Sequence, residues 1–381
     1  MNTAPPAPRA REIVAAATKD PSRGMSAEEA RILETAPART LMMEKLLLVH
    51  YHRTGKTDAL VRQAETIFAA EKSGENAKNL ALARRAQGRA PEAVALLAEH
   101  RELFDPIVWN DLMCMMHGAM GDTAAAVRHG TESLRLKDAA APKAPEFTPR
   151  PAPFDIEKPR SNVIAFSLWG HDRRYIDGAI FNSIVARYLY PGWSVRIYHD
   201  DSLPEDARRT LLAQGAALVR APEDMPAARY GLFWRFLVED DPAVDRYLVR
   251  DADSVMNIKE RAAVEDWLAS NRAFHVMRDL PTHSELILAG MWGAVRGNIG
   301  EMRRRIEAHL GAQNRVLNNV TTDQVFLRNT IWPIVRQDVL VHDAHFEFGE
   351  PRRYRGEFHL PRRYHIGQND WVHRRPAKPA G

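Results

Sequence analysis

The sequence predicts an all-α repeat region followed by an α/β domain with a mainly parallel sheet. Three observations predict this division. Glycines recur at a spacing of 33 residues in the N-terminal third, at Gly55, Gly88 and Gly121. From Ser161 onward, short apolar runs alternate with helical patterns, which is typical of α/β domains. Between the two regions, prolines crowd residues 138–160.

The composition is that of an ordinary globular protein. Of 381 residues, 45% are hydrophobic and 27% are charged, which excludes a wholly disordered or collagen-like chain. The net charge of +4 argues against a dedicated nucleic-acid binder. The single cysteine, Cys114, can form no internal disulfide, which is typical of a reducing compartment. No segment approaches the roughly 20 apolar residues of a membrane helix. We therefore expect no transmembrane segment and a cytoplasmic protein, with peripheral contact at the inner membrane face left open.

Residues 26–137 are expected to form paired helices. They are rich in Ala, Leu, Glu, Arg and Gln, and each of the three recurring glycines sits in a helix–turn signal. Small or apolar residues follow five positions later, at Leu60, Ala93 and Ala126. This pattern resembles a tetratricopeptide array, which could offer a surface to a protein partner. The alternative is an irregular helical bundle. Residues 1–25 are expected to be disordered or loosely helical, and residues 138–160 to be a linker because six prolines forbid regular helix.

Residues 161–381 are expected to form the α/β domain. Apolar runs predict strands over 162–168, 194–198, 217–220 and 246–250, with helices over 175–190, 204–214 and 231–238 between them. Parallel sheets bind ligands outside the carboxyl ends of their strands. Polar clusters stand at those ends, at residues 170–172, 199–201 and 251–253.

The acidic pair Asp251 and Asp253 is the sharpest candidate site. Two carboxylates at a strand end can turn toward one hard cation, and Mg²⁺ or Mn²⁺ so held can bridge a substrate diphosphate. The alternative is a solvated turn. His365 precedes Gly367 near the C-terminus, and histidine is a common transition-metal ligand. Seven arginines lie between residues 351 and 375, and their guanidinium groups suit phosphate oxygens or a solvated basic tail.

Residues 161–375 resemble GT-A-fold nucleotide-sugar glycosyltransferases, most closely the glycogenin-like family 8. The similar segments follow the family's order along the chain: Ala165–Trp169, Leu232–Arg235, Asp251–Asp253, Leu288–Gly293, Thr322–Gln324 and His365–Gly367. The resemblance implies a Rossmann-like domain with Asp251, Asp253 and His365 as metal ligands. It also implies donor binding by Phe166, Ser167, Leu168 and the two acidic residues, and by Gly290 and Gly367. Asp323, Gln324 and Arg235 are the implied catalytic residues.

The sequence departs from the family at two places. The family's phosphate-binding lysine is absent after Gly367, and Arg374 or Arg362 is the expected substitute. The family's Asn-Ser-Gly is replaced by Leu288-Ala289-Gly290, which leaves the donor sugar open. Asp323 follows two threonines and precedes a helical pattern, so we expect it to position groups or cap a helix rather than to attack as a nucleophile.

The expected function is therefore a metal-dependent, retaining transfer of a hexose. The donor is a nucleotide sugar, a UDP-sugar by preference, with Mn²⁺ or Mg²⁺ as cofactor. The acceptor would be a carbohydrate, lipid-linked or protein hydroxyl, as in bacterial surface polysaccharide or glycoconjugate synthesis. One alternative is an interaction adaptor whose transferase-like domain is inactive. Another is a nucleotidyltransferase. Such enzymes usually carry a glycine-rich phosphate loop after the first strand, and Gly170–Arg174 contains one glycine, so this alternative is weaker.

Overall fold

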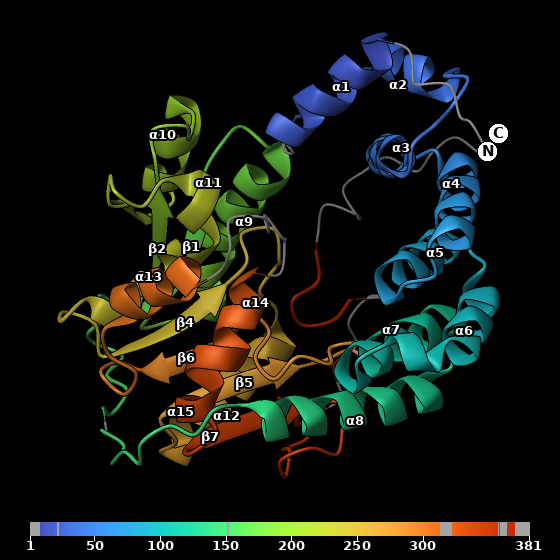
Figure 1. Ribbon diagram of the computed structural model, residues 1–381. Coiled ribbons are helices and arrows are strands. Elements are labelled where there is room, and N and C mark those ends of the chain that lie inside the picture. The colour runs from blue at the N-terminus through green and yellow to red at the C-terminus, as the bar shows by residue number, and fades with distance from the viewer. Residues whose placement is uncertain are drawn as a thin grey trace. The chain divides into compact units, whose positions relative to one another are not determined.

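The computed structural model describes residues 8–20, 23–150, 152–312, 322–356, 358 and 364–369. The chain forms two compact units, residues 1–133 and 134–381 (Figure 1). In the described parts of both units, no helix is long and apolar enough to cross a membrane.

The first unit is all α. Its helices, in chain order, are α1 Pro8–Lys19, α2 Ala27–Glu34, α3 Leu41–Thr54, α4 Thr57–Ala70, α5 Gly74–Ala86, α6 Ala90–Glu99, the 3₁₀ turn η1 Arg101–Leu103, α7 Pro106–Met120 and the start of α8 Thr123–Ala140. Helices α3 to α7 each pack on the next. The helix α1 falls in the stretch expected to be disordered or loosely helical.

The recurring glycines lie between the helices of each pair. Gly55, Gly88 and Gly121 have φ values of +69°, +82° and +76°, and a left-handed backbone of this kind strongly favours glycine. They connect α3 to α4, α5 to α6 and α7 to α8. Ala93 and Ala126 are fully buried. Their small side chains let neighbouring helices approach closely. The prediction of helix pairs that repeat every 33 residues is confirmed.

The second unit is built on a seven-stranded sheet. Its strands are β1 Asn162–Leu168, β2 Ser194–His199, β3 Ala217–Arg220, β4 Arg246–Arg250, β5 Phe274–Arg278, β6 Met291–Val295 and β7 Val339–Asp343. They lie in the order β3-β2-β1-β4-β6-β5-β7. Strand β6 runs antiparallel to both of its neighbours, whereas all other pairs are parallel. The four strands predicted from the sequence are the first four observed.

Helices connect the strands. They are α9 Arg173–Leu189, α10 Glu205–Ala213, α11 Ala227–Tyr230, the 3₁₀ segment η2 Gly231–Asp240, α12 Ile258–Ser270, α13 Met302–Ala312, α14 Thr322–Phe326, the π-helical turn η3 Leu327–Ile331 and α15 Trp332–Val335. The core between sheet and helices contains Phe166, Ile197, Leu248 and Trp267, all fully buried.

The units divide within α8, before the proline-rich stretch that the sequence suggested as the linker. That stretch packs on the α/β unit. The Arg150 backbone N–H donates to Asn298 Oδ1 over 2.8 Å, and the rings of Phe154 and Trp193 stack with centroids 5.7 Å apart. In the last turn of α8, the buried Lys137 donates to the Ser284 carbonyl over 2.7 Å. These contacts explain why residues 138–150 and 152–160 belong with the second unit.

The strand order creates a switch point between β1 and β4. From β1 the chain runs outward through β2 to β3, and β4 then pairs with the other side of β1. Ligands in open α/β sheets bind in the crevice at such a point, outside the carboxyl ends of the strands. The residues at those ends are Leu168 and Arg250, so the polar groups that follow each of them are the place to look for a site.

Candidate functional site

The acidic loop, residues 251–254, follows β4 directly. Two other elements fix its backbone. Asn182 on α9 donates to the carbonyls of Ser254 and Ala252 over 2.7 and 3.3 Å, and its Oδ1 accepts from the Met256 N–H. The first turn of α12 is capped by Asn257, whose side chain accepts from the Glu260 N–H over 3.0 Å. Asp251 and Asp253 therefore project from a loop that is held at both ends.

Arg235 joins two carboxylates. It comes from η2, and its guanidinium forms ion pairs with Asp251 and, over 2.9 Å, with Asp323 at the start of α14. It also donates to the Arg250 carbonyl over 3.2 Å, while its backbone N–H donates to Ser167 Oγ over 2.9 Å. Arg235 is only 5% exposed. The predicted residues Arg235, Asp251, Asp323 and Ser167 are thus brought together.

Arg174 pairs with the second acidic residue. It lies in the first turn of α9, where Asp172 caps the helix by accepting from the Arg174 N–H over 2.9 Å. The Arg174 side chain donates Nε to Asp253 Oδ2 over 2.7 Å, and Nη2 contacts the same oxygen. The Arg174 side chain is 37% exposed and that of Asp253 9%. No local pattern in the sequence marks this arginine, because its partner Asp253 is 79 positions away.

The carboxylates of this site influence one another. Burial raises the pKa of Asp253, the charge of Asp251 raises it further, and Arg174 only partly offsets both. Burial also raises the pKa of Asp323, against the opposing effect of Arg235. Burial by itself would lower the pKa of Arg235, but Asp251 and Asp323 outweigh it and raise that pKa above its usual value. The site therefore concentrates negative charge that two arginines neutralise.

Two glycines let the chain approach the acidic loop closely. A Cβ at Gly290 would lie 2.2 Å from Asp251 Oδ2. A Cβ at Gly178, on α9, would lie 2.2 Å from the Ala252 carbonyl oxygen and 2.9 Å from the Asp253 Cα. Gly290 therefore lies directly against the Asp251 carboxylate, and Gly178 lets α9 with its Arg174 lie against the loop.

The crossing segment, residues 364–369, runs beside the acidic loop. Ser254 Oγ donates to the Gly367 carbonyl over 3.0 Å, and Ser254 and Asn369 form an antiparallel bridge. Gly367 has a φ of +80°, and a Cβ there would lie 2.5 Å from Met291 Sδ. The side chain of His365 points to a different neighbour, since its ring centroid is 5.4 Å from that of His283.

No group of three or more His, Cys, Asp or Glu side chains that could hold a metal ion occurs in the part of the chain that the structure describes. Asp251, Asp253 and His365 are therefore not brought together as a ligand set. A magnesium or manganese ion that arrives with a diphosphate, however, commonly takes only one or two carboxylates from the protein. Asp251 and Asp253 supply that donor set, so the residues present fit a cation that substrate phosphates help to bind.

The other predicted residues lie as follows. Phe166 and Leu168 are fully buried in β1, so only their backbone could face a donor. Gln324 lies beside Asp323 and donates its backbone N–H to the Asp323 carboxylate over 2.9 Å. Arg374 and Arg362, the expected substitutes for the missing lysine, lie outside the described residues.

Residues beneath the acidic loop were also missed by the sequence analysis. Arg250 pairs with Glu260 over 2.6 Å, and Tyr190 donates to the same carboxylate over 2.9 Å. All three side chains are buried. The sequence does show a charged residue, Arg250, at the end of an apolar strand. Its partner Glu260 lies on α12, however, and only the folded chain brings the two together.

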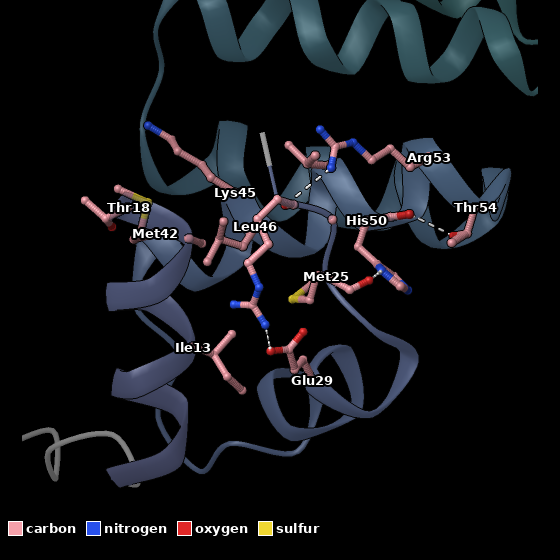
Figure 2. A pocket seen from close by; sticks show the side chains of 14 residues that line it. Ile13, Thr18, Met25, Glu29, Met42, Lys45, Leu46, His50, Arg53 and Thr54 are labelled. Carbon is pink, nitrogen blue, oxygen red and sulfur yellow. Dashed lines mark hydrogen bonds and ion pairs between the residues drawn. The ribbon is translucent and has the colours of Figure 1, made fainter. Parts of the chain in front are cut away.

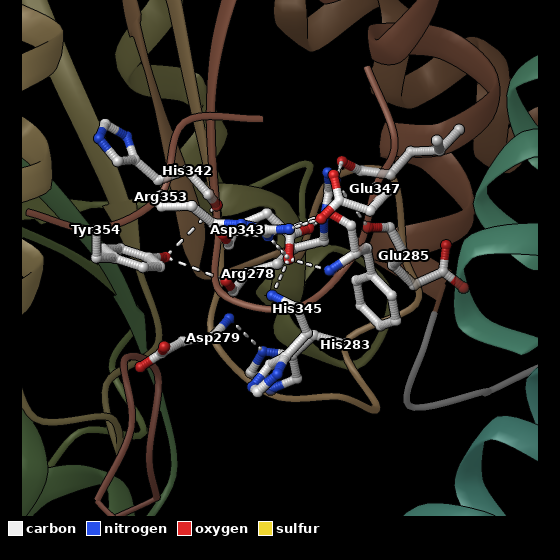
Figure 3. A network of polar contacts seen from close by, with 12 residues as sticks. Arg278, Asp279, His283, Glu285, His342, Asp343, His345, Glu347, Arg353 and Tyr354 are labelled. Carbon is white, nitrogen blue, oxygen red and sulfur yellow. Dashed lines mark hydrogen bonds and ion pairs between the residues drawn. The ribbon is translucent and has the colours of Figure 1, made fainter. Parts of the chain in front are cut away.

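A second polar network lies at the ends of β5 and β7 (Figure 3). The buried ion pair Arg278–Asp343 spans 2.6 Å, and Asp343 Oδ1 accepts from the His345 N–H. His342 contacts His275 over 2.9 Å and Asp266 over 3.3 Å. His342 and His345 are thus part of the structural framework of the α/β unit. Asp279 in this region accepts from the Ile366 N–H over 2.9 Å, which anchors the crossing segment.

The helical unit contains a pocket of about 570 Å³ between α1, the α1–α2 connection, α2 and α3 (Figure 2). Its lining is largely apolar, with Ile13, Met25, Met42, Leu46 and Val49, and Arg23, Lys45 and Arg53 supply positive charge. Arg23 pairs with Glu29, and Lys45 pairs with Glu71. This lining suits binding better than chemistry.

Comparisons with known proteins name no family. No protein-family model matches the sequence, and no curated protein does. Among solved structures, the chain is similar to a mutant of the O-GlcNAc transferase of Thermobaculum terrenum, with a TM-score of 0.41 and 16% sequence identity. The similarity covers 64% of this chain and 46% of that one, so the chain spans less than half of that structure's length.

Proposed function

We propose that the α/β unit is a glycosyltransferase that moves a hexose from a nucleoside-diphosphate sugar to an acceptor hydroxyl. One observation carries the proposal: the acidic pair Asp251 and Asp253 stands at the switch point of the sheet. Gly290 lies against the Asp251 carboxylate, Arg235 forms an ion pair with Asp251, and Arg174 forms one with Asp253. Such a site can hold a diphosphate through a cation and guanidinium groups.

The proposed GT-A-like assignment is supported by the order of the contributing segments. The chain places η2, the acidic loop, Gly290 and Asp323 around one group of carboxylates, in the order in which family 8 carries its similar segments. The crossing segment passes beside the acidic loop through Ser254. The Ser254–Gly367 contact joins residues 113 positions apart, and the Arg235–Asp323 pair joins residues 88 positions apart, so the fold gathers segments that are distant in the sequence.

Asp251 and Asp253 would hold the cation, which we propose to be Mn²⁺ or Mg²⁺ and which would neutralise the departing diphosphate as a Lewis acid. Arg235 keeps Asp251 and Asp323 in fixed positions, because it bonds both and has little freedom to move. Asp323 is buried and paired, which favours a positioning role over nucleophilic attack. The resemblance to family 8 implies retention of configuration, and a UDP-sugar is the proposed donor.

The test is a screen of nucleotide sugars for Mn²⁺-dependent hydrolysis by the full-length protein. We expect at least one UDP-sugar to be hydrolysed, and we expect Asp253→Asn to abolish that activity. The matched control is Asp201→Asn, which changes an exposed aspartate that follows strand β2. Hydrolysis that persists in Asp253→Asn, or that Asp201→Asn removes equally, would contradict the proposed site.

A second candidate function is a binding module whose transferase-like unit is inactive. The pocket of the helical unit favours it, because Met42 and Val49 at its lining are 47% and 46% exposed. Complementation of a strain that lacks the gene separates the two. The adaptor function predicts that Asp253→Asn complements and Val49→Asp does not, whereas the enzyme function predicts that Asp253→Asn fails.

A further inference from the structure

We propose that Arg174 is an exchangeable counter-ion of the donor site. It neutralises Asp253 while the site is empty, and it binds the donor diphosphate once a divalent cation has taken its place on Asp253. This inference rests on the proposed function, and it assigns to Arg174 the phosphate contact for which the family's lysine is missing.

The geometry of the ion pair sets Arg174 and a cation in competition for Asp253 Oδ2. Both Nε and Nη2 of Arg174 contact one oxygen, Asp253 Oδ2. A cation that uses this oxygen must compete with the guanidinium group. Asp253 is largely buried, and a carboxylate in such a place favours a nearby counter-charge. Arg174 supplies that charge while the site is empty, and the cation can take over that role.

The two arginines of the site differ in their freedom to move. Arg235 is buried, pairs with two carboxylates and donates to a backbone carbonyl. The side chain of Arg174 is 37% exposed, and Asp253 is its one ion-pair partner in the described part of the chain. Its guanidinium also lies 5.0 Å from the Tyr175 ring centroid, a weak contact at an exposed site. Arg174 can thus swing away, whereas Arg235 cannot.

The position of Arg174 suits a diphosphate. It stands in the first turn of α9, just beyond the carboxyl end of β1, and Gly178 holds this helix against the acidic loop. A nucleoside diphosphate bound through one divalent cation keeps net negative charge. A guanidinium fork can meet two of its oxygens at once, which a point charge cannot do.

Calorimetric titration separates the two roles of Arg174. Mn²⁺ alone, and then UDP in saturating Mn²⁺, would be titrated into the wild type, Arg174→Met and Arg174→Lys. The control is Arg173→Met, a neighbouring and 58% exposed arginine that pairs with Asp177 within the same helix. We expect Arg174→Met to bind Mn²⁺ alone several-fold more tightly, because the competitor is gone. We expect UDP to bind about tenfold more weakly, with Arg174→Lys between the two.

The outcomes distinguish this inference from the proposed function. If the wild type binds neither Mn²⁺ nor UDP, both are overturned. If the wild type binds them and Arg174→Met binds Mn²⁺ and UDP like Arg173→Met, the proposed function stands and the exchange is wrong. Weaker binding of Mn²⁺ by Arg174→Met would likewise overturn it, because Arg174 would then assist the cation rather than compete with it.

Discussion

The charged residues of the proposed donor site differ in burial and in the number of their partners, so their removal should cost different amounts of folding free energy. Arg235→Met leaves Asp323 buried without its counter-charge, and breaking a buried pair in this way costs about 3–5 kcal/mol. Arg174→Met affects a partly exposed pair, for which we expect about 1 kcal/mol or less. Urea unfolding of the two variants, monitored by circular dichroism, measures both free energies.

The double variant Arg235→Met/Asp323→Asn serves as the control for the first of these predictions. Because it removes the unpaired carboxylate together with the arginine, it should be more stable than Arg235→Met. A double variant that is less stable than Arg235→Met would mean that lost packing, and not buried charge, dominates the effect.

Gly290 makes a second prediction at the residue scale. Gly290→Ala places a methyl group against the Asp251 carboxylate, because a Cβ at this position would lie 2.2 Å from Asp251 Oδ2. The carboxylate must move, so Mn²⁺-dependent UDP binding should weaken by about tenfold or more. Gly311→Ala is the matched control, because a Cβ there meets nothing within 4 Å. Equal binding by the two variants would show that Asp251 is free to adjust.

The residues of the site could be predicted from sequence only where a local pattern marks them. Asp251 and Asp253 follow an apolar strand, and that placement was visible. Arg174 was missed because its partner is 79 positions away and meets it only when α9 packs on the acidic loop through Gly178. For His365, the resemblance implied a place among the metal ligands. Its segment does reach the acidic loop, but its ring lies against that of His283.

At the scale of elements, the repeated turns of the helical unit should behave alike. Gly55, Gly88 and Gly121 have positive φ, and a Cβ at each meets nothing within 4 Å. Substitution by alanine therefore adds backbone strain and no clash, with an expected loss of about 1–2 kcal/mol at each position. Thermal and urea unfolding of the three variants checks this. A difference of several kcal/mol among them would show that the turns are not equivalent.

The first four strands were predictable because each is a short, mainly apolar run next to a helical pattern. The last three were not. Strand β5 contains the buried His275 and Arg278, which local hydropathy assigns to a surface. These residues are tolerated inside because His342 and Asp343 on β7 pair with them across more than 60 positions. Strand β6 overlaps the segment Leu288–Gly293, which the sequence marks only by its resemblance to family 8. Its antiparallel direction follows from pairing that no local pattern records.

At the scale of the whole molecule, buried histidines should make the protein sensitive to acid. Burial and the nearby His365 lower the pKa of His283 to about 3, and burial lowers the pKa of His342 to about 4. Both pKa values lie below the ordinary 6.5, so the unfolded chain binds more protons. Their contribution to stability is complete above pH 6.5 and is lost as the pH falls toward 4.

Urea unfolding between pH 7 and pH 4.5 measures this effect. At pH 5, each of these histidines should account for about 2 kcal/mol of the loss. His342→Gln should therefore have a shallower pH dependence than the wild type, whatever its stability at pH 7. His52→Gln, at an exposed histidine of α3, should keep the wild-type slope. If His342→Gln keeps that slope as well, His342 does not drive the acid sensitivity.

The sequence predicts that the chain divides into two units, but it does not predict where the boundary between them lies. The change from glycine-spaced helices to alternating strands and helices marks two units. The proline-rich stretch looked like the boundary because prolines prevent regular helix, yet prolines do not prevent packing. Contacts such as Phe147 with Phe274 hold that stretch to the sheet unit.

The most direct measurement of the central claim is calorimetric titration of UDP into the full-length protein, with Mn²⁺ and again with a chelator. The claim is that Asp251 and Asp253 present a cation to a nucleoside diphosphate at the switch point of the sheet. It predicts that the wild type binds UDP with Mn²⁺ and loses that binding in the chelator, and that Asp253→Asn binds UDP in neither condition. UDP binding that is equal in the wild type and Asp253→Asn, or that is indifferent to Mn²⁺, would contradict it.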